Sequence, residues 1–380
     1  MVNARPAPSP TEELSRAWLA AVMIGTATLL AYINTFAVPF LFDDGASILQ
    51  NDTIRSLWRA WWPPNENGLT VSGRPFLNFT LALNYATGGT AVRGYHAVNL
   101  LIHALAGCTL FGVVRRTLEL PRLVERFGED ATWLALTATL LWVLHPLQTE
   151  SVTYIIQRAE SLVGLLYLLT LWGFIRSTEP GAQGKWIWLA CGASVLGMAT
   201  KEVMVTAPVM IACYDRVFLS GSWREVWKRR GRRHLALAAT WVVLAALVLA
   251  SGNRGGTAGF GTSVSPFAYA ITQIGVVADY LRLACWPQPL IFDYGQFLAK
   301  GFAAVLWPAM LVLPLAVASI YGLWRGHPAG GWAGAIPRGG AARPEFQTGP
   351  GECRAGGAAG QGVGPVGRGS VYSSMVGKLM

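Results

Sequence analysis

Apolar blocks of membrane-spanning length recur along the chain and constrain its fold more than any other feature. A helix needs about 20 predominantly apolar residues to cross the hydrocarbon core of a bilayer. Only 13% of the 380 residues are charged, whereas an ordinary globular chain has roughly 25%. The sequence therefore predicts an all-α, polytopic membrane helix bundle with about 8–10 spans.

The apolar blocks locate the predicted spans. The first block is too long for the core of a signal peptide, so we expect a retained first helix. One block is interrupted near its middle by Lys201 and Glu202, and neither half reaches normal span length, so we expect two short crossings joined by a turn at this pair. In order, the blocks cover about residues 18–38, 95–114, 131–144, 161–175, 186–214, 235–250, 267–285 and 302–323.

The chain divides into three regions. Residues 1–16 are the expected cytoplasmic N-terminus, and residues 17–325 the transmembrane domain. Residues 326–380, of which 16 are Gly, form a tail that we expect not to pack. The bias of this tail is that of a GC-rich gene read in a shifted frame, and the alternative is a flexible linker.

A long first loop, residues 39–94, separates the first two spans and mixes acidic, aromatic, Pro and Gly residues. Within it, residues 48–62 and 75–85 have helical apolar spacing with several Trp or Phe. Such segments are typical of helices that lie along the membrane interface. We therefore expect two interfacial helices in this loop.

Basic residues gather between the apolar blocks, with the richest clusters at residues 115–126 and 216–233. The positive-inside rule puts both clusters in the cytoplasm. The loop at 39–94, the hinge at 145–160 and the turn at Lys201 are then exoplasmic. This pattern accounts for the net charge of +10 without a nucleic-acid partner, and the five Cys have no paired spacing that indicates a disulfide or metal site.

Two polar segments carry the first candidate residues. Asp43 and Asp44 directly follow the first apolar block, where partial desolvation raises the pKa of a carboxyl and its value as a base. The alternative is a helix cap or solvation of the helix end. The hinge offers His145, Glu150, Arg158 and Glu160. An Arg there can bind a phosphate bidentately, or it forms a surface ion pair with Glu150 or Glu160.

Other polar residues lie at membrane depth. Lys201 and Glu202 favour a role in a cavity over mutual neutralisation, because buried ionisable residues are costly. His96, Asn99 and His103 share one face of the second span, where interhelical hydrogen bonding is favoured over catalysis. No phosphate loop, dinucleotide fingerprint or zinc motif occurs, so neither a cofactor nor a metal is expected.

Six segments in order resemble the membrane part of the transmembrane and tetratricopeptide-repeat (TMTC-like) O-mannosyltransferases of the GT-C superfamily. The resemblance covers about residues 15–325. The segments are LFDDGASILQND, GRPFLNFTLALNYATGG, GYHAVNLLIHAL, HPLQTESVTYIIQRAE, ATKEVMVTAPVMIACYD and VVADYLRLACWPQPLIFDYG.

The resemblance implies a GT-C-like transmembrane domain and a glycosyltransferase. Such an enzyme moves a mannose-like sugar from a polyprenyl-phosphate carrier to a hydroxyl acceptor, a protein Ser or Thr, on the exoplasmic face of the membrane. Its partners are the carrier, the acceptor and membrane lipid. A bacterial cytoplasmic membrane is favoured, with the endoplasmic reticulum as the location in a eukaryote.

The resemblance also assigns residues. Asp43 and Asp44 match the family's acidic motif, where one carboxylate positions or deprotonates the acceptor. The carrier phosphate is assigned to matches of the Arg-Pro, Arg-Ala-Glu and Lys-Glu elements: Arg74, Arg158, Glu160, Lys201 and Glu202. Apart from the resemblance, His96, His103, His145 and Glu150 are candidates for supporting roles because of their positions in the second span and the hinge. Gln157 stands where the family usually has Gly, and the tetratricopeptide repeats are absent.

A non-catalytic transporter, a lipid-binding protein or a repeat-protein scaffold is the alternative function. An enzyme depends on Asp43 or Asp44. A transporter depends more on the intramembrane pair of Lys201 and Glu202.

Overall fold

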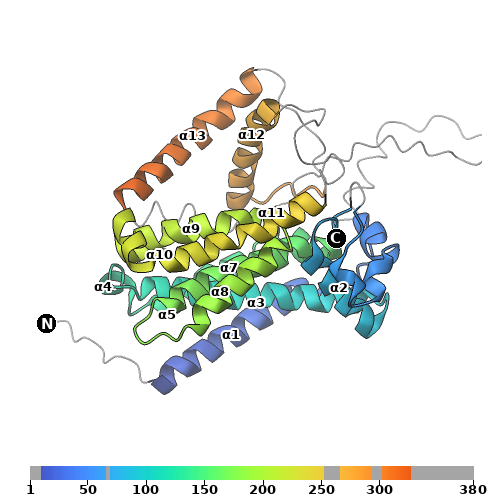
Figure 1. Cartoon of the computed structure of the whole chain (residues 1–380), viewed down its shortest axis with the longest axis horizontal. Helices are drawn as coiled ribbons and strands as arrows, with labels where there is room; N and C mark the ends of the chain where they lie inside the picture. The colour runs from blue at the N-terminus through green and yellow to red at the C-terminus, as the bar shows by residue number, and fades with distance from the viewer. Residues whose placement is uncertain (1–9, 66–68, 252–265, 293–301, 327–380) are drawn as a thin grey trace, which may run out of the picture.

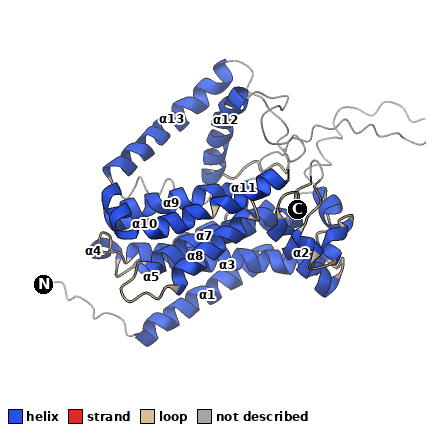
Figure 2. Cartoon of the chain, viewed as in Figure 1, coloured by secondary structure: helices blue, strands red, loops and turns tan. Residues whose placement is uncertain are grey.

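The computed structural model describes residues 10–65, 69–251, 266–292 and 302–326, and within these ranges the regular elements are helices, with no strand (Figure 2). Two of the described helices are apolar but short, α5 (Ala131–Val143) and α8 (Lys185–Met198). The all-α polytopic fold is confirmed. The sequence predicts about 8–10 spans. Among the described residues, six helices are long and apolar enough to cross a membrane: Thr11–Ala37, Val92–Leu118, Ile155–Ser177, Glu202–Ser220, Trp223–Ala250 and Val305–Arg325.

A central layer of helices forms the core of the bundle (Figure 1). Helix α3 (Val92–Leu118) packs against α1 (Pro10–Tyr32), α5 and α7 (Arg158–Ser177), and α7 packs on α8. The approach is close at Gly107 of α3, where a Cβ would lie 2.7 Å from Val143 and 2.9 Å from Ile24. A larger residue there would push α1 and α5 away from α3.

The remaining helices cover this layer. Helices α9 (Ala207–Tyr214), α10 (Trp223–Ala239) and α11 (Trp241–Ala250) follow the central layer along one side. Helices α12 (Pro266–Cys285) and α13 (Phe302–Arg325) project from the bundle and approach each other at their far ends (Figure 1).

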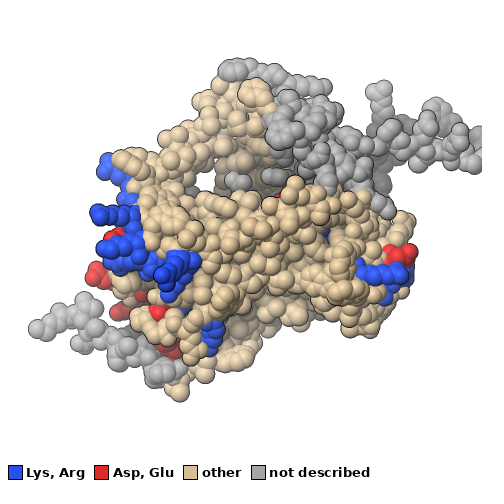
Figure 3. Space-filling model, in the orientation of Figure 1, with Lys and Arg blue, Asp and Glu red and all other residues tan. Residues whose placement is uncertain are grey.

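The predicted acidic and basic segments lie at opposite ends of the bundle. One end holds the loop before α2 (Pro75–Gly88) and the hinge before α7. The other holds α4 (Val124–Phe127) and the beginning of α10, where Arg122 donates to the Val217 carbonyl and Arg116 pairs with Glu179. The face in Figure 3 has its charged side chains at its two ends, with a broad uncharged surface between them. Such a surface suits a lipid-facing belt.

Two predicted elements of the first loop have different outcomes. The helix predicted at 75–85 is confirmed as α2, which begins with Pro75 at its first position, and its place along the membrane interface stays a prediction. The prediction of one continuous helix at 48–62 is wrong, because hydrogen bonds of the Asn51 side chain favour a turn there. This side chain accepts from the Thr53 amide at 3.0 Å and donates to Asn78 at 2.8 Å. The segment instead forms three short turns, Gly45–Leu49, Asp52–Arg55 and Arg59–Trp61.

The predicted break at Lys201 is confirmed. Helix α8 ends at Met198, and the Thr200 and Lys201 amides both donate to the Gly197 carbonyl before a 3₁₀ turn, Glu202–Thr206, leads into α9. The predictions for residues 1–9 of the N-terminus and for residues 327–380 of the tail lie outside the described residues.

Candidate functional site

The residues that the sequence analysis singled out come together at one end of the bundle from four separate segments. They belong to the loop after the first span, the loop before α2, the hinge that opens α7 and the turn after α8. Direct contacts join these segments: Asp44 with the Ile156 amide, Lys201 with Glu160, and Arg74 with Glu202. The site is therefore assembled by tertiary packing of segments far apart in sequence.

Asp44 is buried and links two backbone segments through its carboxylate, and we call this pair of hydrogen bonds the Asp44 clamp. Only 1% of the residue is exposed, and its two carboxylate oxygens accept from the backbone amides of Leu41 at 2.9 Å and Ile156 at 2.8 Å. Burial raises its pKa to about 7, although both hydrogen bonds act in the opposite direction. Its side chain makes no capping bond to the turn that follows. Asp44 thus ties the loop to the hinge, and the helix-cap alternative does not describe it.

Asp43 has a different environment. The residue is half-buried, and its Oδ2 accepts from the Thr70 hydroxyl at 3.3 Å. Its backbone amide donates to the Tyr154 hydroxyl at 2.9 Å. Two adjacent carboxyls are therefore distinguished by structure: Asp44 faces backbone amides in the interior, and Asp43 faces a hydroxyl at the partly open side.

The backbone before this pair is strained. Phe42 has a φ of +39°, in the left-handed region that a bulky residue rarely adopts. Its ring stacks on Phe292 with centroids 5.0 Å apart, and the Asp44 clamp closes the same turn. Strain of this kind persists only where surrounding contacts hold it, and such positions cluster at functional sites.

Arg158 is fully buried, with 0% of the residue exposed. Its guanidinium donates to Asn99 Oδ1 at 2.6 Å, to the Thr80 carbonyl at 3.1 Å and to the Tyr95 carbonyl at 3.1 Å. These bonds join α7 to α2 and α3. The alternative interpretation, a surface ion pair of Arg158 with Glu150 or Glu160, is wrong, because the Arg158 side chain lies in the interior.

Two ion pairs lie at the same end. Lys201 pairs with Glu160, and Arg74 Nη2 lies 3.4 Å from Glu202 Oε2. Lys201 and Glu202 therefore point to different partners, and mutual neutralisation of these neighbours is excluded. Both cations retain some exposure, 16% for the Lys201 side chain and 8% for that of Arg74.

Thr70 and Tyr154 are site residues that sequence reasoning missed. Thr70 donates to Asp43 through its hydroxyl and accepts from Arg74 Nη1 at 2.7 Å through its carbonyl. It thus connects the acidic residue to the basic one. Tyr154 lay within the quoted hinge segment, yet a lone hydroxyl in a sequence carries no signal of what it will contact.

The residues with supporting roles fall into two groups. His96 contacts Thr35 Oγ1 and the Val38 carbonyl, both at 2.9 Å, and His103 contacts the Val143 carbonyl at 3.0 Å, so the favoured interhelical hydrogen bonding is confirmed. His145 contacts the Ala284 carbonyl at 3.1 Å, and Glu150 accepts from Gln157 at 3.4 Å. Glu150 thus makes a contact within the hinge, whereas His145 joins the hinge to α12. Within the described ranges, no three His, Cys, Asp or Glu side chains form a group suited to a metal ion.

Fold and site together define a polytopic all-α membrane protein with an acidic pair and two ion pairs at one end. Over 294 residues, or 70% of the chain, it is 29% identical to the protein O-mannosyl-transferase Tmtc2 of Drosophila melanogaster. It is also 29% identical over 330 residues, 78% of the chain, to Tmtc1 of the same organism. With tmtc2 of Xenopus laevis it shares 32% identity over 200 residues, 49% of the chain.

These similarities confirm the resemblance to the TMTC-like family. The matches span 29%, 36% and 23% of the length of the three relatives, so the chain corresponds to about a third or less of each. The relatives come from animals and give no support to the expected bacterial membrane. No protein-family model matches the chain, and no solved structure matches it.

Proposed function

We propose that the chain is the membrane part of a GT-C type O-mannosyltransferase. It takes mannose from a polyprenyl-phosphate carrier and places it on a Ser or Thr hydroxyl at the exoplasmic face. The names of the relatives support the transferase and its protein acceptor. The observation that carries the proposal is the unequal pair, in which Asp44 is locked by two backbone amides and Asp43 keeps a carboxylate at the partly open side.

Asp43 is the base in this mechanism. Its carboxylate takes the proton of the acceptor hydroxyl as the oxygen attacks the anomeric carbon of the sugar. The bond from that carbon to the phosphate oxygen breaks, and the lipid phosphate leaves with the electron pair. One displacement without a carboxylate nucleophile inverts the anomeric centre. Asp44 positions the base by fixing the turn that carries it.

The cations at the same end receive the leaving phosphate. Lys201 is the more exposed of the two, and Arg74 is joined to Asp43 through Thr70. Positive charge fixed beside the developing phosphate charge stabilises the transition state. Glu160 and Glu202 hold these cations in place until the donor binds. The buried Arg158 orients the hinge and does not contact the phosphate.

Lys201→Gln is expected to weaken binding of a polyprenyl-phosphate sugar by roughly tenfold, because a charge-assisted contact to phosphate is lost. The measurement is the donor Kd of the full chain in nanodiscs. Arg59→Gln is the matched control: Arg59 is an exposed cation in the first loop and is outside the two ion pairs. Equal donor affinity in the Lys201 and Arg59 variants would remove Lys201 from the phosphate site.

We also expect the first loop, which carries Asp43 and Asp44, to be exposed on the exoplasmic side of the membrane. Gly45→Cys in a cysteine-free background should react with an impermeant maleimide added from the exoplasmic side, since a Cβ at Gly45 meets nothing within 4 Å. Arg232→Cys on α10 should react from the cytoplasmic side, following the positive-inside rule. Reaction of Gly45→Cys from the cytoplasmic side alone would contradict the proposed topology.

A further inference from the structure

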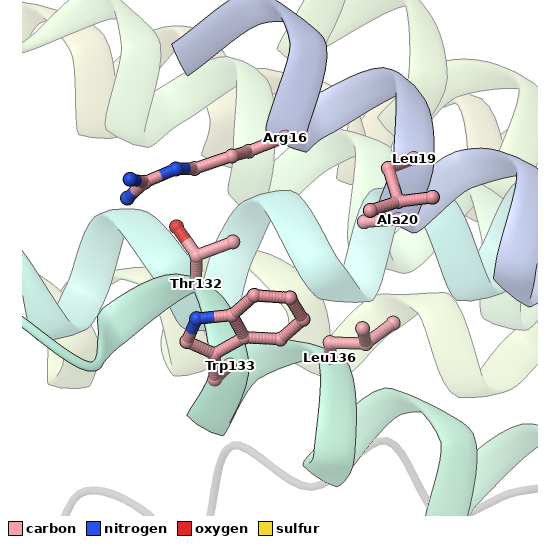
Figure 4. A pocket seen from close by; sticks show the side chains of 6 residues that line it. All are labelled: Arg16, Leu19, Ala20, Thr132, Trp133 and Leu136. Atoms are coloured by element: carbon pink, nitrogen blue, oxygen red, sulfur yellow. The ribbon is translucent and has the colours of Figure 1, made fainter. Parts of the chain in front are cut away.

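A small pocket lies between the beginnings of α1 and α5 (Figure 4). Asp43 lies toward the opposite end of the bundle, because it follows the C-terminal end of α1. Both helices run from the end that holds the pocket into the bundle, and they pack on each other through Ala20, Ile24 and Leu136. The pocket is lined by Arg16, Leu19 and Ala20 of α1 and by Thr132, Trp133 and Leu136 of α5.

The pocket is polar at one end and apolar at the other. The Arg16 guanidinium, the Thr132 hydroxyl and the indole nitrogen of Trp133 lie at one end in Figure 4, with the aliphatic side chains at the other. The order follows from the sequence, because in each helix the polar residues precede the aliphatic ones by about one turn. The pocket thus changes from polar to apolar along the direction in which the helices enter the bundle.

The charge of the pocket is positive. Its lining contains one Arg and neither Asp nor Glu. Among the described residues, no carboxylate forms an ion pair with Arg16, although the neighbouring Arg115 pairs with both Glu13 and Glu119. Guanidinium, hydroxyl and indole N–H groups are all hydrogen-bond donors, and a phosphate supplies several acceptors.

The depth of the pocket matches the headgroup region of a bilayer. Arg16 lies near the start of the first apolar span, Thr11–Ala37. Trp18 and Trp133 are 66% and 52% exposed near the same end. Exposed Trp side chains in membrane proteins gather at the membrane–water interface. A cavity of about 50 Å³ is too small to enclose a sugar or nucleotide, so most of any ligand must lie outside it along the helix surface.

We propose that this pocket binds the phosphate of a membrane phospholipid, with an acyl chain lying along Leu19, Ala20 and Leu136. The order of donors and then apolar surface along the bundle is the order of headgroup and chain in a lipid. A free phosphate would use the donors and leave the aliphatic end unfilled. The bound lipid joins α1 to α5 at the end where both helices begin.

Lipid binding by the purified full chain tests this proposal. Native mass spectrometry should give phosphatidylglycerol adducts whose apparent Kd rises roughly tenfold in Arg16→Gln, because one charged phosphate contact is lost. Arg224→Gln, an exposed cation of α10, is the matched control and should bind lipid as the unmodified chain does. Since Arg16 is exposed, its variant should unfold at the same temperature without lipid.

Two further probes separate the sources of phosphate. Diacylglycerol, which lacks a phosphate, should bind at least tenfold more weakly than phosphatidylglycerol. Inorganic phosphate at millimolar concentration should not displace the lipid. Unchanged lipid affinity in Arg16→Gln, equal binding of diacylglycerol, or displacement by inorganic phosphate would each overturn the proposal.

Discussion

Asp43→Asn is expected to reduce sugar transfer by about 10²–10⁴-fold, the usual cost of losing a general base. The amide keeps the size of the side chain and an oxygen that can accept from Thr70, but it cannot take a proton from the acceptor near neutral pH. Donor binding should stay within a factor of two to three, since Asp43 is not assigned to the phosphate. Transfer rate and donor Kd measured on the same preparation separate the two effects.

Asp44→Asn is the matched comparison. The Leu41 and Ile156 amides approach different oxygens of Asp44, so the NH₂ group of an Asn side chain would face one of these two donors. We expect a lower unfolding temperature in this variant, with activity reduced through displacement of the turn. Full activity of Asp43→Asn, together with an inactive but normally stable Asp44→Asn, would reverse the assignment of the two residues.

Arg158→Met should destabilise the fold by about 2–4 kcal/mol, because it leaves the buried Asn99 Oδ1 without its donor at a cost of about 1–3 kcal/mol and removes two further hydrogen bonds to helix carbonyls. The acceptors belong to Asn99, Thr80 and Tyr95 on the two helices that Arg158 joins to α7. The unfolding temperature in nanodiscs measures the effect. Arg59→Met, at an exposed position, is the control and should leave that temperature unchanged.

This result distinguishes the structural role of Arg158 from the phosphate-binding role that the sequence predicts. A phosphate ligand at Arg158 predicts weaker donor binding with normal stability. A positioning residue predicts lower stability, with donor binding near normal in the protein that remains folded. Normal stability with a donor Kd raised tenfold or more would contradict a positioning role for Arg158.

The lengths of the apolar blocks and the positions of the charged residues were sufficient to predict a helix bundle with an acidic end and a basic end. Apolar runs specify helices because a bilayer leaves no other partner for backbone groups. The basic clusters at 115–126 and 216–233 meet at one end of the bundle, as expected for loops that the positive-inside rule puts on the same side. The break at Lys201 was also predictable, since a charged residue at membrane depth is costly. These features depend on local sequence and the properties of the membrane.

The details of the site depend on long-range contacts, which the sequence does not reveal. Adjacent aspartates are equivalent in the sequence, and only the approach of Ile156, more than a hundred residues away, makes Asp44 a clamp. The partners of Lys201 and Arg74 come from α7 and the turn after α8. The turns within 48–62 follow from Asn51 and Asn78, whose mutual bond overrides the helical spacing of the apolar residues.

The most direct test of the proposed function is mannose transfer by the chain itself. The purified protein in nanodiscs receives polyprenyl-phosphate-[¹⁴C]mannose and a Ser/Thr-rich peptide, and both mannosyl-peptide and free mannose are measured, because water can replace a missing acceptor. We predict that the unmodified chain releases mannose from the carrier and that Asp43→Asn does not, although it still binds the carrier. Release at equal rates by both proteins would contradict the assignment of Asp43 as the base.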